Sequence, residues 1–179
     1  MGFPSDDATS ERPRTRYRVP GRIAALAILY VVLVEGPRQM IQLNAEWQWP
    51  RWQIPGGRLI GSALMVGTVA VWLYCSRLFE RVGKGTPFVT EPPQQLVTVG
   101  LYGYSRNPIY VAHVAFLLGW FLRSGCPAVL LYTGVIVALI HATIVWLEEP
   151  GLRERFGEAY VRYTHTVPRW LFIRPAERA

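Results

Sequence analysis

Long apolar blocks without a single charged residue dominate the chain. Three such blocks cover residues 59–74, 107–122 and 124–147. A helix needs roughly 20 mostly apolar residues to cross a bilayer, and flanking side chains that reach the interface relax that requirement. Each block therefore predicts a transmembrane helix, and together they predict an all-α, polytopic membrane protein.

A fourth apolar block, residues 23–34, is shorter and ends at Glu35-Gly36-Pro37. Arginine-rich sequence precedes it, so the core of a signal peptide is one alternative, but no small-x-small cleavage site follows. We expect a retained helix that extends to about Leu43, is kinked near Pro37, and turns Glu35 toward protein or water. The expected total is about four transmembrane helices.

The distribution of charge favours one orientation in the membrane. The chain has 19 Lys and Arg against 12 Asp and Glu, a net charge of +7. With four spans, 15 of the 19 basic residues lie on the side of both termini and four on the other. The positive-inside rule then predicts that both termini are cytoplasmic. The basic residues are dispersed and no binding motif accompanies them, so we expect attraction to anionic lipid headgroups and no nucleic-acid partner.

The length of the chain suits one domain. Residues 1–18 are polar and are expected to be disordered, whereas residues 19–179 are expected to form a single membrane domain with a motif-bearing core at 83–170. The Gly- and Pro-rich residues 83–105 predict a cytoplasmic loop without a long helix. The apolar positions of residues 151–163 recur every three or four residues and predict an amphipathic helix, which would cap a cofactor site.

Two short features concern packing. The turn Arg123-Ser124-Gly125 between the third and fourth helices is so short that it forces an antiparallel hairpin. Cys75 and Cys126 fall within or at the ends of spans on opposite faces. We interpret both cysteines as packing residues and expect neither a metal site nor a disulfide.

Charged residues gather at the cytoplasmic ends of the third and fourth spans. Arg106-Asn107 precedes one span and Glu148-Glu149 follows the other. Arg106 could be a basic anchor at the interface, and Glu149 could simply end its span. Alternatively, Arg106 and Asn107, beside the exposed N–H groups of a helix start, bind a carboxylate, and Glu148 holds a cationic amine. Together the two clusters suit a zwitterion, such as the amino-acid end of a cofactor.

Two histidines lie inside the apolar blocks. His141, Ile144 and Glu148 share one helical stripe, because seven residues make nearly two turns. We expect a stripe that carries an intramembrane histidine and a carboxylate to face the interior of the bundle. His113 and His141 could each be a hydrogen-bonded core residue, or could contact a substrate headgroup or take up a proton.

Two motifs carry a family resemblance. The pattern L-V-x-x-G-x-Y-x-x-x-R-[HN]-P-x-Y is matched by residues 96–110, and the pattern E-E-x-x-L-x-x-x-F-G-x-x-Y-x-x-Y-x-x-x-V-P by residues 148–168. Through these motifs, residues 58–170 resemble the isoprenylcysteine carboxyl methyltransferase and phospholipid methyltransferase superfamily of integral membrane enzymes. Residues 83–87 resemble the bacterial branch of that superfamily, which implies a location in the bacterial inner membrane.

The resemblance implies S-adenosylmethionine as the cofactor, bound without a Rossmann domain. The expected cofactor-binding residues are Gln94, Gln95, Leu96, Val97, Tyr102, Arg106, Asn107, Pro108, Ile109, Tyr110, Glu148 and Glu149. By similarity, the first five would surround the adenosine, and residues 106–109 would approach the methionine end. Glu148 would hold the amine of that end, and His113 and Ile144 are expected to face the substrate.

Two positions depart from the family pattern. Asn107 stands where many members have histidine; it keeps the hydrogen bonding but loses the titration, which argues against proton transfer there. Ile144 stands where the isoprenylcysteine enzymes have an arginine associated with the substrate carboxylate. An apolar side chain does not pair with a carboxylate, so we do not expect prenylcysteine as the substrate.

The expected reaction is in-line transfer of the sulfonium methyl group to an amphiphilic acceptor that enters from the bilayer, either an isoprenoid or lipid carboxylate, a hydroxyl, an amine or a thiol. Positioning and water exclusion would supply most of the rate without a metal. Arg106 and His141 are the catalytic candidates, with His141 as the base. The alternatives are a membrane reductase that uses NADPH, since sterol reductases share a similar C-terminal motif, and a non-catalytic membrane protein with a degenerate site. The oligomeric state stays open.

Overall fold

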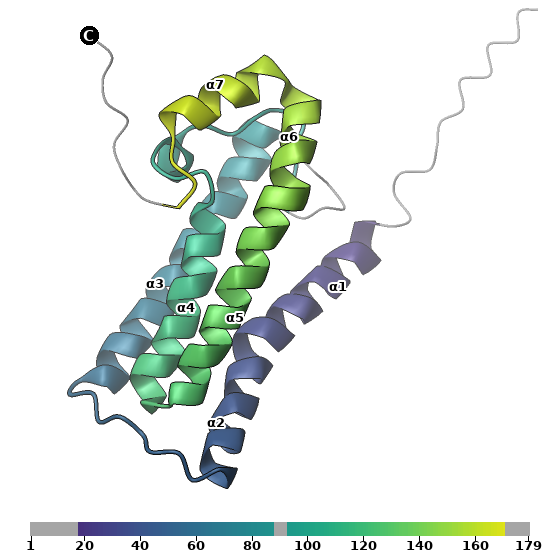
Figure 1. The fold of residues 1–179 in the computed structure, drawn as a ribbon. Coiled ribbons are helices and arrows are strands. Elements are labelled where there is room, and N and C mark those ends of the chain that lie inside the picture. The colour runs from purple at the N-terminus through teal and green to yellow at the C-terminus, as the bar shows by residue number, and fades with distance from the viewer. Residues whose placement is uncertain (1–17, 88–92, 171–179) are drawn as a thin grey trace, which may run out of the picture.

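The structure is a computed structural model that describes residues 18–87 and 93–170, and every regular element within those residues is a helix (Figure 1). The first long helix consists of α1 (Arg18–Tyr30), the π-helical turn η1 (Val31–Glu35) and α2 (Gly36–Glu46). The second consists of α3 (Gly57–Leu78) and the π-helical turn η2 (Phe79–Gly83). A short 3-10 turn, η3 (Gly100–Gly103), precedes α4 (Pro108–Ser124). The last long helix consists of α5 (Pro127–Thr143), the π-helical turn η4 (Ile144–Glu148) and α6 (Glu149–Phe156), and α7 (Glu158–Thr166) follows it.

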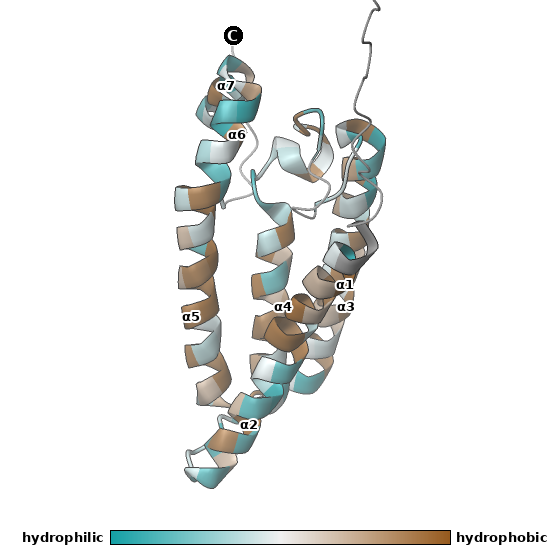
Figure 2. Cartoon of the chain, turned by 90° about the vertical axis from the view of Figure 1, so that its right-hand side faces the viewer, coloured by the Kyte–Doolittle hydropathy of each residue, from teal (hydrophilic) through white to brown (hydrophobic). Residues whose placement is uncertain are grey.

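Three of these helices are long and apolar enough to cross a membrane. They cover Gly21–Glu46, Gly57–Gly83 and Pro127–Phe156, and the 17 residues of α4 form a shorter apolar helix beside them. Large apolar side chains point outward, as in Leu59 (77% exposed) and Trp146 (74% exposed). Figure 2 shows this hydrophobic surface most clearly along α5, with hydrophilic residues at the ends of the bundle. The predicted all-α, polytopic membrane architecture is confirmed.

Glycines bring α3 and α4 into close contact. A Cβ atom on Gly61 would lie 2.5 Å from the carbonyl oxygen of Gly119, and one on Gly57 would lie 2.3 Å from the carbonyl oxygen of Leu122. Gly57 and Gly61 are four residues apart and therefore lie on one face of α3. Small residues at this spacing let two backbones approach in a membrane, where dispersion contacts take the place of the hydrophobic effect. The close approach of α3 and α4 fixes the central pair of the bundle.

The turn between α4 and α5 is as short as the sequence predicts. Gly125 ends α4 with a φ of +61°, and a Cβ atom there would lie 1.9 Å from the carbonyl oxygen of Trp52. The amide of Trp52 donates a hydrogen bond of 2.7 Å to the carbonyl oxygen of Gly125. The loop that leads into α3 is therefore fastened under the hairpin, as Figure 1 shows at the end of the bundle opposite α7.

The first helix is irregular at η1, just before Pro37. The amide of Gly36 bonds to the carbonyl oxygen of Val31, five residues back. Pro37 has no N–H group to offer. The carbonyl oxygens of Val32 and Leu33 therefore lose the partners that a regular α-helix would supply. In a membrane, such groups must find a partner within the protein.

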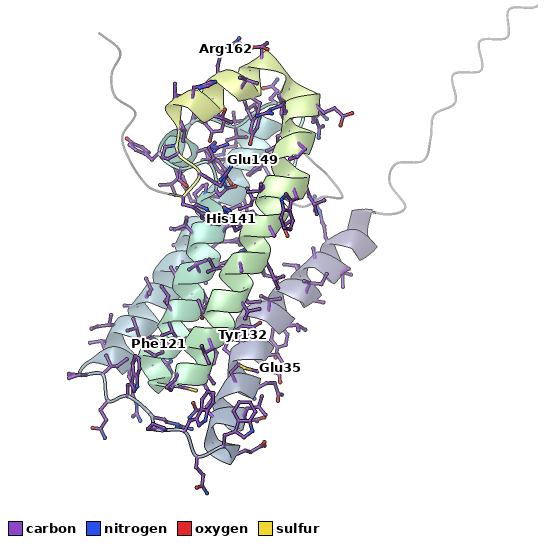
Figure 3. All side chains as sticks on the ribbon, viewed as in Figure 1. Glu35, Phe121, Tyr132, His141, Glu149 and Arg162 are labelled. Atoms are coloured by element: carbon purple, nitrogen blue, oxygen red, sulfur yellow. The ribbon has the colours of Figure 1, made fainter. Side chains whose placement is uncertain are left out.

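Side chains of the neighbouring helices supply those partners. The Tyr132 hydroxyl of α5 donates to the carbonyl oxygen of Val32 at 2.9 Å, and the Trp120 indole of α4 donates to that of Leu33 at 2.9 Å. Gly36 makes room, because a Cβ atom there would lie 2.3 Å from the Tyr132 hydroxyl. Figure 3 shows Tyr132 beside the first helix. The predicted helix past Pro37 is thus present, and its irregularity takes the form of a π turn.

The C-terminal helix differs from its prediction. We expected one amphipathic helix over residues 151–163, but the fourth span continues through Phe156 and the chain breaks at Gly157, which has φ +52° and ψ −132°. Only glycine adopts this conformation without strain. The break lets α7 turn across the end of the bundle (Figure 1). The predicted disorder of residues 1–18 lies outside the described residues except at Arg18, where α1 begins, and the single-domain organisation stays a prediction.

We predict that Gly61→Ala destabilises the protein and that Gly67→Ala does not. Both glycines lie on α3, but a Cβ atom on Gly67 meets open space, whereas one on Gly61 meets the backbone of α4. Forcing one carbon into such a contact costs about 1–3 kcal/mol. Thermal unfolding of the two variants in detergent would measure the difference, and equal midpoints would contradict the close helix contact.

Candidate functional site

The start of α4 is bound to the C-terminal segment that follows α7. The amide of Arg106 donates to the carbonyl oxygen of Pro168 at 2.9 Å. The Asn107 side-chain amide and the Ser105 hydroxyl both donate to the carbonyl oxygen of Arg169, at 3.1 and 3.3 Å. The two sequence motifs of the chain are therefore joined to each other directly, and Asn107 uses its side-chain N–H in that junction.

Glu149 is the centre of an ion-pair network. Arg169 donates to its two carboxylate oxygens at 2.6 and 2.9 Å, in a bidentate arrangement. Arg106 lies 3.1 Å from the same carboxylate, and the side chains of Arg106 and Glu149 are only 11% and 18% exposed. The hydrogen bonds with Glu149 raise the pKa of Arg169 above its ordinary value. Partly buried charges of this kind are stable only as a set, because each one alone would lose its hydration.

The neighbouring carboxylate, Glu148, has a different partner. The Tyr110 hydroxyl of α4 donates a hydrogen bond to it. Among the described residues, no arginine or lysine forms an ion pair with Glu148. Two consecutive glutamates thus differ in role, since Glu149 pairs with two arginines while Glu148 pairs with neither.

Tyr160 and Tyr163 of α7 and Tyr102 of η3 are buried at this end of the bundle. The Tyr163 hydroxyl donates to the carbonyl oxygen of Tyr102 at 2.6 Å. Burial raises the pKa of both Tyr102 and Tyr163 well above the ordinary value, so both side chains keep their protons at neutral pH. Tyr160 lies beside Tyr163, and its hydroxyl accepts a hydrogen bond of 3.5 Å from Arg106.

The residues expected around the adenosine separate into two groups. The amides of Gln94 and Gln95 bond to the carbonyl oxygen of Gly83, and their side chains are exposed. In contrast, Val97 and Tyr102 are buried together with Cys75, and Ile109 packs against them. Leu96 packs against the α7 tyrosines, and Pro108 is fully buried at the first turn of α4. Their expected cofactor contacts stay predictions.

Of the expected stripe of His141, Ile144 and Glu148, His141 does not face the interior of the bundle. Ile144 is buried, but His141 is exposed and accepts a hydrogen bond from the Trp170 indole at 3.3 Å. The π turn η4 over residues 144–148 adds one residue to a helical turn and shifts Glu148 by about 100° relative to His141, so these two side chains no longer share a face. Figure 3 shows His141 on α5 below Glu149. The proposed role of His141 as a base stays a prediction.

The other histidine lines a cavity of about 270 Å³ between the first helix, α3 and α4. Its wall is otherwise mostly apolar and includes Leu33, Val69 and Phe116. The Nε2 atom of His113 is buried and has no hydrogen-bond partner among the described residues. The His113 ring also meets the Tyr110 ring edge to face, with 6.0 Å between centroids. One wall residue of the cavity therefore contacts Tyr110, which binds Glu148.

A comparison with protein-family models shows to which family the chain belongs. A family model described as phospholipid methyltransferase matches residues 57–159, more than half of the chain. The chain belongs to the phospholipid methyltransferase family. Membership indicates methyltransferase activity on lipid-like substrates. The comparisons with curated proteins and with solved structures found no match.

The phospholipid methyltransferase match includes Arg106, Glu148 and Glu149 but ends before Tyr160 and Arg169. Arg169 is also absent from the site residues predicted from the sequence. Its only signal was its place directly after the Val-Pro pair of the second motif. Because its partner Glu149 lies 20 residues away and across a chain reversal, spacing alone did not pair them.

We predict that Glu149→Ala loosens the junction between α4 and the C-terminal segment. Breaking a buried ion pair costs about 3–5 kcal/mol, and less where one partner is partly exposed. Hydrogen exchange of the Arg106 amide and of α7 should become at least about tenfold faster, which corresponds to about 1.4 kcal/mol. Glu154→Ala on the exposed side of α6 is the control. Equal exchange in the two variants would show that Glu149 does not hold the segment.

Proposed function

We propose that the protein transfers the methyl group of S-adenosylmethionine to an amphiphilic acceptor dissolved in the membrane. The reaction takes place where α4 begins and α5 ends. The observation that carries the proposal is the division between the two glutamates. Glu149 pairs with both arginines of the site, so the Glu148 carboxyl group is left with the neutral Tyr110 hydroxyl as its partner among the described residues. Family membership supports the same chemistry.

The residues present fit the zwitterionic end of the donor. The Nε atom of Arg106 is buried and has no hydrogen-bond partner among the described residues. Such a donor is rare in proteins unless a ligand or water satisfies it. Arg106 would hold the donor's carboxylate and Glu148 its amine, as charge-assisted hydrogen bonds. When bound, S-adenosylmethionine supplies a methyl group already activated on a sulfonium.

The rest of the site positions these two groups and excludes water. Tyr110 fixes the Glu148 carboxylate from α4. Asn107 holds the C-terminal segment through its side-chain amide, and we assign it this structural task. The segment and α7 cover the end of the bundle, which strengthens the electrostatic contacts inside. We assign this end to the cytoplasm from the distribution of basic residues.

The cavity beside His113 suits the apolar part of the acceptor. It lies between membrane-spanning helices and is lined mainly by apolar side chains and by His113, whose ring contacts Tyr110. An acceptor whose chain occupies this cavity brings its polar end toward Glu148 without leaving the bilayer. His113 is a polar residue of the wall, and its buried Nε2 atom has no hydrogen-bond partner among the described residues. The proton of a hydroxyl, thiol or ammonium acceptor therefore passes more directly to His113 than to His141, which is bonded to Trp170.

We predict that the purified protein binds S-adenosylmethionine and that Glu148→Gln weakens this binding by about 10- to 150-fold. The variant keeps the size of the side chain but loses a hydrogen bond to a charged group, which contributes about 1.5–3 kcal/mol. Calorimetry in detergent would measure both affinities. Glu154→Gln, on α6 and exposed, should bind like the wild type.

Three results would overturn this assignment. Equal affinity in Glu148→Gln and in the wild type would remove Glu148 from the donor site. Saturable binding of NADPH without binding of S-adenosylmethionine would move the protein to the membrane reductases. Binding of neither compound would favour a non-catalytic protein.

We predict that filling the cavity impairs use of the acceptor but not of the donor. Val69→Phe places a ring in the cavity, whereas Val66→Phe places the same ring at a position of α3 that is 71% exposed. With a lipid extract and a labelled methyl donor, the first variant should raise the KM for the acceptor. His113→Phe should instead lower kcat, because it removes the proton acceptor. Wild-type kinetics in Val69→Phe would exclude the cavity as the acceptor site.

A further inference from the structure

A second pocket lies at the end of the bundle opposite the proposed methyl-transfer site. The loop before α3, the start of α3 and the end of α4 surround a volume of about 420 Å³. Three arginines line it, namely Arg51, Arg58 and Arg123, and none of the described residues in its wall is acidic. Trp52 contributes an aromatic ring to the same wall. The loop that carries Arg51 and Trp52 passes beneath α4 and α5 (Figure 1).

The second feature of this pocket is its positive charge. Within residues 18–87 and 93–170, none of the three arginines forms an ion pair with a carboxylate. Arg123 donates a hydrogen bond to the neutral Ser62 hydroxyl. Like charges around one pocket repel each other. The arrangement is therefore favourable when an anion occupies the pocket, and guanidinium groups bind phosphate oxygens in pairs.

The position of the pocket indicates which kind of anion would bind there. α3 begins at Gly57 and α4 ends at Ser124, so the pocket lies where the apolar helices end and lipid headgroups begin. Immediately inward, Leu59 is 77% and Ile60 55% exposed. Trp47, Trp49 and Trp52 lie in the loop at the same end, as tryptophans do at membrane interfaces.

We propose that this pocket binds the phosphate group of an anionic phospholipid, with the acyl chains along Leu59 and Ile60. The neighbouring apolar surface favours a lipid over free phosphate, because free phosphate has no acyl chain to place on that surface. The 17 residues of α4 place the pocket about 25 Å from the polar end of the bundle. The bound lipid is therefore distinct from the methyl acceptor, and it fastens the loop and the α4–α5 turn to one leaflet.

Native mass spectrometry of the full-length protein tests this site with phosphatidylglycerol, phosphatidylcholine and inorganic phosphate as probes. We expect phosphatidylglycerol to bind at least tenfold more tightly than phosphatidylcholine. The triple variant Arg51→Gln, Arg58→Gln, Arg123→Gln should lose this preference. A control triple variant, Arg77→Gln, Arg81→Gln, Arg162→Gln, removes equal charge from exposed residues elsewhere and should keep it.

Equal binding of the two lipids by the wild type, or an unchanged preference in the first triple variant, would overturn the proposal. Inorganic phosphate that binds as tightly as the anionic lipid would overturn the assignment to a lipid. The single variant Arg51→Gln changes only a loop residue, so it tests the site even if the triple variant does not fold. It should weaken phosphatidylglycerol binding severalfold and reduce the rise in melting temperature that this lipid produces; no change in either would contradict the site.

Discussion

The carboxylate of Glu149 joins three parts of the chain that the sequence keeps far apart. Arg106 reaches it from the start of α4, and Arg169 reaches it from the segment after α7. Without that central charge, two guanidinium groups would face each other at the end of a membrane-spanning bundle, one of them nearly buried. The covered end of the bundle, the geometry of the α4 start and the isolation of Glu148 all depend on this one residue.

The bilayer imposes a second constraint, which acts on the backbone. A proline inside a spanning helix leaves carbonyl oxygens without donors, and lipid supplies none. At η1, Tyr132 and Trp120 provide the missing hydrogen bonds from two other helices. An irregularity in one helix thereby becomes the contact that fixes its place in the bundle. The glycines of α3 and α4 also fix the position of helices in the bundle, because they let two backbones come into direct contact.

The long helices and the antiparallel hairpin could be predicted, because length, hydropathy and a three-residue turn leave few alternatives. The motif residues also gathered at one end, as Arg106 and Glu149 show. What could not be predicted depends on helical phase. The π turn before Glu149 rotates Glu148 away from the stripe of His141, and no residue in that segment signals it. The break at Gly157 was hidden in a regular amphipathic pattern, and the partner of Arg169 depends on that break.

The first helix lies outside the residues that match the family, yet it forms one wall of the cavity beside His113. The residues assigned to the methyl donor lie on other helices. If this cavity takes the proposed acceptor, one of its walls is therefore separate from the proposed donor site. Under the proposed function, substitutions in the first helix would alter lipid preference while leaving every residue assigned to the methyl donor in place.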